Sequence, residues 1–172
     1  MMPIHTKRLI LREPTLGDAP CYALGVGEYE VARFLTPVPY PYSLAMAVDW
    51  LRQARPATPE QALLVIELPG KGLIGCVSLL SELGFWIARP HWNRGYVTEA
   101  AIALLDWHFA GCDGDMVTSS AHHDNVASLA VQRKLGFQPT GREMRFSQTL
   151  QHNVEHVVSA LSRRDWQARR AA

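Results

Sequence analysis

The chain has 172 residues, of which 48% are hydrophobic and 19% charged, and its formal net charge is +1. This length and composition are typical of one soluble globular domain, spanning residues 1–172, with a sizeable core. A long nucleic acid or a membrane surface usually requires a basic excess or a clustered Lys/Arg face, so both partners are disfavoured.

The start of the chain, MMPIHTKRLILREP, lacks the apolar core of a signal peptide, and no run approaches the roughly 18 apolar residues of a membrane span. We therefore expect a cytoplasmic protein. Cys21, Cys76 and Cys112 are odd in number and widely spaced, which fits neither a disulfide framework nor a zinc site. They are expected to be reduced thiols.

The N-terminal region predicts a strand and then a helix. Residues 8–14, RLILREP, have the composition of a strand that ends at Pro14. The following residues 15–25, TLGDAPCYALG, offer Thr15 or Asp18 as a helix cap.

A proline-rich loop separates this region from an amphipathic helix. Residues 36–42, TPVPYPY, contain three prolines, which favour a loop. Residues 43–54 begin with Ser43 as the expected cap. Their apolar side chains recur at helical spacing, at Leu44, Val48 and Leu51.

Three apolar runs follow in close succession, at residues 62–68, 73–80 and 82–88. The first two are separated by PGKG, in which Gly70 and Gly72 allow the positive φ that a tight hairpin requires. The runs predict three consecutive antiparallel strands.

The C-terminal half alternates helical and strand patterns. Residues 97–110 predict a long helix, residues 115–121 a strand, residues 125–137 a helix and residues 154–162 a last strand. The long helix places one line of side chains on its inner face, at Val97, Ala101, Leu104 and His108.

The helix over residues 125–137 has the clearest ends. Asn125 or Asp124 can cap its start, and Gly136 can adopt the left-handed conformation at its end. Taken together, the elements predict a mixed sheet with helices on its faces, in a single α/β domain.

The stretch RPHWNRGYVTEAAIALL, residues 89–105, places Arg94 and Gly95 where a strand turns into the long helix. The first N–H groups of a helix lack partners within it and carry the positive end of its dipole. A phosphate or pyrophosphate is therefore favoured as ligand, although Gly95 could serve the turn alone and Arg94 face solvent. No GxGxxG or GxxxxGK[ST] motif is present, so simple dinucleotide or nucleoside triphosphate binding is disfavoured.

Five segments carry a family resemblance in a fixed order: TKRLILREPTLGDA, LIGCVSLL, ELGFWIARPHWNRGYVTEA, DNVASLAVQRKLGF and HVVSALSRRDW. They resemble the GCN5-related N-acetyltransferase (GNAT) superfamily and, within it, the RimJ/RimL-type ribosomal-protein N-acetyltransferases. The resemblance covers nearly the whole chain. It implies a twisted mixed sheet of six or seven strands with about four helices, in which strand 82–88 splays from strand 115–121.

The resemblance also implies acetyl-CoA as co-substrate, no metal, and direct transfer of the acetyl group to a primary amine. The pyrophosphate is expected at the backbone amides of residues 94–98. Two positions depart from the family's loop pattern, because Trp92 stands where Gln or Arg is usual and Val97 where Gly or Ala is usual. The residues expected to bind the coenzyme are Phe85, Trp86, Ile87, Asn93, Arg94, Gly95, Tyr96, Val97, Thr98, Asn125 and Ser128.

Ser128 is implied to protonate the departing thiolate, since Gln132 stands where many members carry a tyrosine. Ser128 lies at helical spacing from Val131 and Leu135 and is expected to face the sheet. From the residues alone, the favoured interpretation of Ser128 is a small residue near a helix start. Asn125 is implied to meet the pantetheine arm and could also be only a cap.

The general base is less clearly marked. Glu82, before the central strand, could order a water near the amine or could be a solvated charge, while Glu67 and His122 are weaker candidates. The run His122-His123-Asp124 resembles a metal cluster, but neighbouring residues on a strand point to opposite faces, so no metal is expected. Neither Cys76 nor Cys112 is expected to form a covalent intermediate. Cys76 lies in an apolar strand, and the acidic neighbours of Cys112 would hold its thiol protonated.

The preferred acceptor is the α-amino group of a peptide or protein. Two alternatives stay open: an enzyme that acetylates small amines or aminoglycosides, and a domain that binds coenzyme A without turnover. The acceptor pocket is expected to come from two variable loops, at residues 26–43 and 140–153. Monomer and homodimer are both compatible with the sequence.

Overall fold

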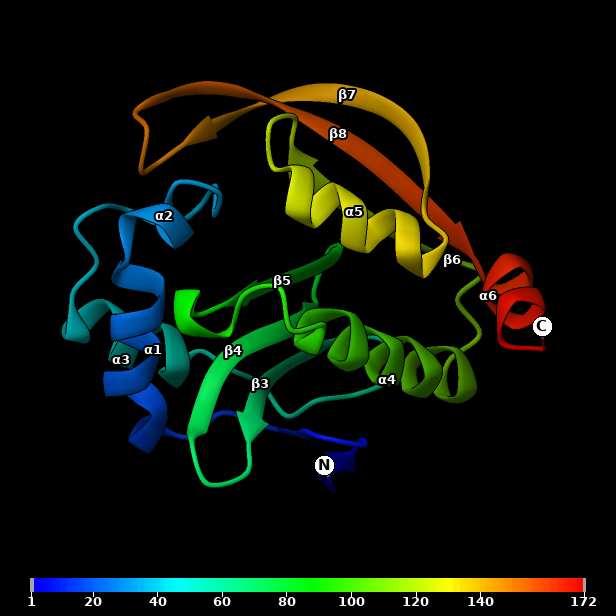
Figure 1. Cartoon of the computed structure of the whole chain (residues 1–172), viewed down its shortest axis with the longest axis horizontal. Helices are drawn as coiled ribbons and strands as arrows, with labels where there is room; N and C mark the ends of the chain where they lie inside the picture. Colours follow the sequence, from blue (N-terminus) through cyan, green and yellow to red (C-terminus); the bar gives the residue numbers. More distant parts are fainter. Residues whose placement is uncertain (1, 172) are drawn as a thin grey trace.

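The structure is a computed structural model, and it describes residues 2–171 (Figure 1). Within these residues, eight strands form two antiparallel sheets, one in the order β1-β2-β3-β4-β5 and the other in the order β6-β8-β7. The strands are β1 (Ile4–His5), β2 (Ile10–Arg12), β3 (Ala62–Leu68), β4 (Gly72–Leu79), β5 (Leu83–Ile87), β6 (Met116–His122), β7 (Gln138–Ser147) and β8 (His152–Ser162).

Helices flank both sheets. Figure 1 shows α1 and α3 near one end of the molecule and the long curved β7–β8 hairpin along the top of the view. None of the helices in residues 2–171 has the length and apolar character needed to cross a membrane. The helices are α1 (Ala19–Gly27), α2 (Tyr29–Ala32), α3 (Leu44–Arg52), α4 (Tyr96–Gly111), α5 (Val126–Leu135) and α6 (Arg163–Ala171), with short 3-10 turns at Leu16–Asp18 and Arg89–His91.

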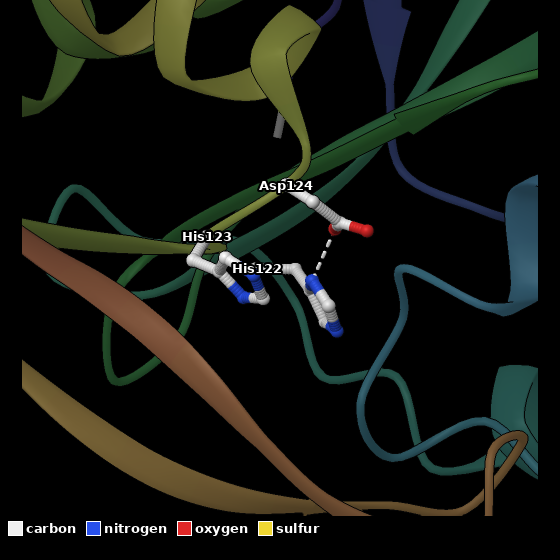
Figure 2. A group of neighbouring side chains, drawn as sticks. All are labelled: His122, His123 and Asp124. Atoms are coloured by element: carbon white, nitrogen blue, oxygen red, sulfur yellow. Dashed lines mark ion pairs between the residues drawn. The ribbon is translucent and has the colours of Figure 1, made fainter.

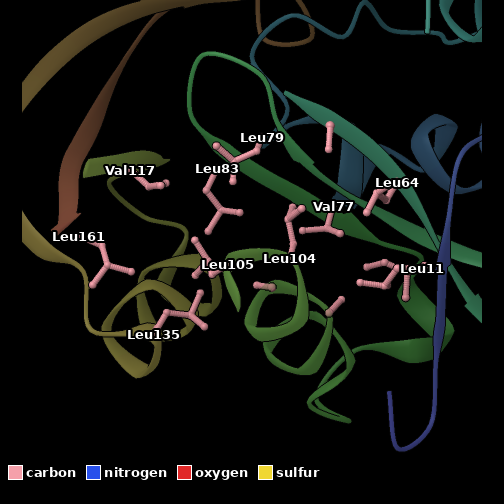
Figure 3. Close-up of a cluster of buried hydrophobic side chains, with 14 of the residues drawn as sticks. Leu11, Leu64, Val77, Leu79, Leu83, Leu104, Leu105, Val117, Leu135 and Leu161 are labelled. Carbon is pink, nitrogen blue, oxygen red and sulfur yellow. The ribbon is translucent and has the colours of Figure 1, made fainter. Parts of the chain in front are cut away.

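The first sheet is covered on both faces, and β3 shows how. Leu64 and Ile66 pack with α4 in one core, whereas Leu63 and Val65 pack with α1 and α3 in the other. This is the period of two that a strand buried on both faces requires. Figure 3 shows the first core, where Leu104 and Leu105 of α4 lie among side chains from both sheets.

Most predicted elements are confirmed. The predicted line on the long helix is buried along its whole length, and the three-strand meander forms with Gly70 and Gly72 at positive φ in its first turn. Ser43 caps α3 by accepting a hydrogen bond from the Met46 amide at 3.2 Å. Gly136 ends α5 at φ +95°. The cysteines are free thiols, as expected.

The α/β fold class is confirmed, but the sheet arrangement differs from the single mixed sheet. All strand pairings among the described residues are antiparallel. Strands β5 and β6, which a single sheet would have joined, lie in different sheets and form no ladder with each other. The expected splay between these two strands is therefore present as a complete separation of two sheets.

Two predicted loops contain regular structure. The short helix α2 lies within residues 26–43, and β7 takes up much of residues 140–153. Strand β7 was missed because almost all of its residues are exposed, so it shows no buried alternation. A helix prediction also needs correction, since Leu44 of α3 is 53% exposed and Ala47 instead faces the core with Leu51.

The close pairing of β4 with β5 predicts that substitution of Gly75, which lies opposite Ile87, destabilises the fold. A Cβ added there would overlap the carbonyl oxygen of Trp86 and lie 3.0 Å from the Cα of Ile87. We expect Gly75→Ala to lower the free energy of unfolding by about 1–3 kcal/mol, because the backbone of β5 must shift. Denaturant unfolding measures this.

The matched control is Gly141→Ala in β7, where an added Cβ meets nothing within 4 Å. It should change stability by no more than about 0.5 kcal/mol. Equal losses for the two variants would contradict the explanation by steric overlap.

Candidate active site

A cleft of about 890 Å³ lies between the two sheets. Its walls come from β4 and β5, the start of α4, the end of β6, α5, β7, β8, and the segment from α1 to α3. The twelve residues predicted from sequence for catalysis or coenzyme binding all line it. They are Glu82, Phe85, Trp86, Ile87, Asn93, Arg94, Gly95, Tyr96, Val97, Thr98, Asn125 and Ser128.

A chain of hydrogen bonds joins the two sheets near the cleft. Ser119 of β6 donates through Oγ to the carbonyl oxygen of Leu83, at 2.8 Å. Gln132 of α5 donates through Nε2 to the same Oγ at 3.0 Å, and its side chain is buried. Gln132 thus has a structural partner in β6, which explains a polar residue at this buried position.

The start of α4 forms one end of the cleft. Gly95 has φ +75° and Asn93 has φ +59°, so the chain enters the helix through a tight left-handed turn. The first helical hydrogen bond runs from the amide of Glu99 to the carbonyl oxygen of Gly95, at 3.1 Å. The amides before it, at residues 96–98, are the N–H groups that a helix leaves without internal partners. They can bind an anion.

Arg8, which the sequence reasoning missed, supports this turn. Its Nε lies 2.6 Å from Oε2 of Glu99, its Nη1 donates to the Arg94 carbonyl oxygen at 2.9 Å, and its guanidinium lies over the ring of Tyr96. Burial alone would raise the pKa of Glu99, but hydrogen bonds from Thr6 and Arg8 outweigh burial and lower it. The carboxylate is therefore compensated by Arg8 beside the anion site.

Asn125 and Ser128 meet at the start of α5. The Asn125 Oδ1 accepts a hydrogen bond from the Ser128 amide at 3.1 Å, so the capping role of Asn125 is confirmed. Ser128 is half-buried and lines the cleft, whereas Gln132 and Leu135 are the fully buried residues of this helix. The expected orientation of Ser128 toward the sheet is thus replaced by one toward the cleft, and its role as an acid stays a prediction.

Glu82 is bound by an arginine from the second sheet. Arg145 of β7 donates to both of its carboxylate oxygens, at 2.6 and 3.3 Å, and the Ser120 hydroxyl donates to Oε1 at 2.9 Å. The hydrogen bond that Arg145 donates to Glu82 raises the pKa of Arg145, and a close contact with Glu143 adds to this. Glu82 is therefore ion-paired, and a base at this position would have to compete with Arg145.

Aromatic side chains line the part of the cleft formed by residues 22–50, which we call the aromatic end. The ring centroids of Tyr22 and Trp86 are 5.2 Å apart, and those of Tyr22 and Tyr42 are 6.4 Å apart. Phe34 and Trp50 line the same cleft. Burial raises the pKa of Tyr22, so its hydroxyl stays protonated. Phe34 and Tyr42 lie in residues 26–43, one of the two loops expected to form the acceptor pocket, whereas Tyr22 and Trp50 lie on expected helices and were not assigned to the site.

A polar group adjoins the aromatic end. The Thr36 Oγ1 lies 3.1 Å from the Nε2 of His156, and both residues line the cleft. His156 is buried, and burial lowers its pKa, with smaller contributions from Arg145 and His122. Thr36 and His156 are 120 positions apart, so no local sequence pattern could have joined them.

The alternation expected of His122, His123 and Asp124 is not observed, because only His122 belongs to β6. His123 follows the last residue of β6, so strand alternation does not apply, and the His122 and His123 rings stack at 5.1 Å (Figure 2). Asp124 pairs with His122 and also lies 3.4 Å from Arg33. Because the carboxylate already has these two partners, we assign no ion to the group.

The other base candidates lie outside the cleft. Glu67 pairs with Arg12 at 2.6 Å, on the β2–β3 pair, and His122 is buried behind the cleft wall. Cys76 does line the cleft, but burial raises the pKa of its thiol, which disfavours the thiolate that a covalent intermediate requires.

Comparison with known proteins assigns this architecture. The sequence model described as an acetyltransferase (GNAT) domain matches residues 8–138 of the chain. The chain belongs to the GNAT acetyltransferase family. It is therefore an N-acetyltransferase with acetyl-CoA as co-substrate, and the family resemblance of the sequence motifs is confirmed.

Similar proteins extend over the whole chain. The uncharacterized N-acetyltransferase p20 of Bacillus licheniformis is 22% identical over 177 residues, which cover 96% of this chain and 99% of the relative. RimJ of Mycobacterium smegmatis, solved in complex with CoA-disulfide, is 18% identical with a TM-score of 0.77, covering 90% of this chain and 81% of its own.

A ribosomal-protein-S5-alanine acetyltransferase from Vibrio fischeri is 15% identical, has a TM-score of 0.78, and covers 96% of this chain and 99% of its own. These neighbours share the GNAT fold.

The turn at the start of α4 predicts how acetyl-CoA affinity responds to substitution. We expect Gly95→Val to weaken binding severely, because a β-branched side chain at positive φ distorts the turn and covers the open amides. Arg94→Ala should weaken binding only modestly. Titration calorimetry with acetyl-CoA measures both.

Gly70→Val is the matched control, since Gly70 has φ +76° in the β3–β4 turn and lies outside the cleft. It imposes the same backbone strain and should leave the affinity unchanged. An unchanged affinity in Gly95→Val would refute the placement of the pyrophosphate.

Proposed function

We propose that this GNAT enzyme transfers the acetyl group from acetyl-CoA to the α-amino group of a peptide or protein. The observation that carries the choice of acceptor is the charge balance of the cleft. Among the described residues that line it, each carboxylate is paired with an arginine: Glu30 with Arg33, Asp49 with Arg52 and Glu82 with Arg145.

A polycationic acceptor such as an aminoglycoside needs uncompensated negative charge in its pocket. This cleft offers aromatic side chains instead, including Tyr42 and Trp50, with arginines beside its carboxylates. Such a surface suits an acceptor that carries one amine and an otherwise uncharged backbone, as a peptide N-terminus does. The names of the ribosomal-protein acetyltransferase among the structural neighbours and of RimJ support the same class.

The ionisation of amines favours the same acceptor. An α-amine with a pKa near 8 is roughly one tenth neutral at pH 7, while a lysine amine near 10.4 is neutral only about once in 2,500 molecules. Only the neutral amine has the lone pair that attacks a thioester. A site whose carboxylates are occupied by arginines therefore suits the α-amine far better.

In the proposed mechanism, the amides at residues 96–98 hold the pyrophosphate, and Asn125 positions the pantetheine arm. The free edge of β5, from Phe85 to Ile87, offers backbone amides that can polarise the thioester carbonyl. The amine attacks the carbonyl carbon directly, the C–S bond breaks, and Ser128 protonates the departing thiolate.

The role of Ser128 is tested by Ser128→Ala. We expect kcat to fall about 100- to 10,000-fold, because the thiolate then leaves without a positioned acid. Thiol release at saturating substrates gives kcat, and calorimetry gives the acetyl-CoA affinity separately, so that a loss of binding is not mistaken for a loss of the acid. Full turnover in this variant would show that the acid is another group.

The acceptor is tested by competition between two peptides. One has a free N-terminus and blocked lysines, and the other has an acetylated N-terminus and free lysines. We expect the first to be acetylated preferentially, as measured by mass spectrometry. Preference for the second peptide, or for an aminoglycoside over both, contradicts the acceptor, whereas no thiol release with any amine would indicate a domain that binds coenzyme A without turnover.

A further inference from the structure

We propose that Thr36 and His156 form the proton relay that removes the proton from the acceptor nitrogen during acetyl transfer. Thr36 lies between α2 and α3 and His156 lies on β8, and the Thr36 Oγ1 is 3.1 Å from the His156 Nε2. The inference rests on amine acetylation, the reaction of the family, and does not depend on which amine is used.

The two residues have complementary exposure. His156 is 3% exposed, so a substrate does not contact its ring directly. Its Nδ1 is buried and has no hydrogen-bond partner among the described residues. Thr36 is half-buried and lines the cleft. The hydroxyl can therefore receive a proton from the cleft while it passes its own to the imidazole behind it.

The surroundings of His156 keep the imidazole in its neutral, proton-accepting form. Its ring meets the ring of His122 from β6 edge to face, with centroids 5.8 Å apart. Burial lowers the pKa of His156 first, and the positive charge of Arg145 and the presence of His122 lower it further, against smaller opposing effects of Glu82 and Glu143. At neutral pH the ring is thus uncharged and can accept a proton.

Glu82, by contrast, is less available as a base. Its oxygens accept hydrogen bonds from Arg145 and Ser120, and protonation would break the ion pair with Arg145. Arg145 therefore acts on both groups: it pairs with the carboxylate of Glu82 and disfavours a positive charge on His156. The Thr36–His156 pair lines the same cleft and offers an imidazole that can accept a proton.

The proton balance closes with Ser128 as the acid. The lone pair of the neutral amine forms the C–N bond, the C–S bond breaks, and the thiolate takes the Ser128 proton. The proton of the acylated nitrogen passes to the Thr36 oxygen as the Thr36 proton passes to Nε2 of His156. His156 then releases a proton to solvent and Ser128 regains one, so the transfer consumes no net proton.

The test compares Thr36→Val, His156→Ala and the double variant with the parent enzyme. Valine keeps the shape of threonine and removes the hydroxyl. We expect each single variant to lower kcat about 100-fold or more, and the double variant to be no slower than the slower single one, because both remove one relay. The acetyl-CoA affinity should be unchanged in all three.

Three further readouts separate a relay from a structural role. The parent kcat should fall as pH drops through a pKa below 6.5, the ordinary value for histidine, because the relay needs the neutral imidazole, and this dependence should be absent in both single variants. Added imidazole should restore part of the turnover of His156→Ala. His152→Ala, an exposed histidine at the start of β8, is the matched control and should keep full turnover.

Rates are measured in three assays: with the peptide that has a free N-terminus, with tyramine, and without any amine. In the amine-free assay, acetyl-CoA is hydrolysed slowly by water, and this reaction also needs a base. If only the peptide is not acetylated, the proposed acceptor is contradicted, and the relay is still measured in the tyramine and amine-free assays. Turnover that is retained in His156→Ala in all three assays overturns the relay. So does additive loss in the double variant, or a loss in His156→Ala that imidazole does not restore.

Discussion

The structure depends on the separation of β5 from β6. A sheet would normally continue across this boundary, because unpaired backbone groups away from water are costly. Here the two strands are connected by the Ser119 side chain at the beginning of β5, and the rest of β5 has a strand partner only in β4. The free edge of β5 therefore needs a polar, extended partner, and the acyl-pantetheine arm of acetyl-CoA has that shape and chemistry.

The divergence of the strands also places two helix starts beside the cleft. Each sheet edge leads into a helix beside the cleft: β5 leads through Gly95 into α4, and β6 leads through Asn125 into α5. The α4 start leaves its amides open for an anion, whereas Asn125 caps one amide of α5, that of Ser128. One helix start is thereby suited to the pyrophosphate and the other to a neutral part of the ligand.

Local sequence patterns predicted the elements on either side of the cleft, because their signals lie within a few residues. The buried period of β3 and the glycine before α4 are such signals. The missed contacts join distant positions: Arg8 supports a turn 86 residues away, and Arg145 holds a carboxylate 63 residues away. Strand β7 could not be predicted for another reason: an exposed strand needs no alternation of apolar and polar residues, so its sequence carries no strand pattern.

These long-range contacts divide the cleft into two electrostatic regions. At the α4 end, Arg8 compensates Glu99, so the helix dipole and Arg94 leave a net attraction for phosphate. At the aromatic end, each carboxylate has an arginine and the imidazole of His156 is held neutral, so no strong field remains. In the proposed function, the α4 end orients the charged coenzyme, and the other end favours the neutral form of an amine over its ammonium form. Since only the neutral form attacks, the charge pairing that suits the proposed acceptor also favours its reactive form.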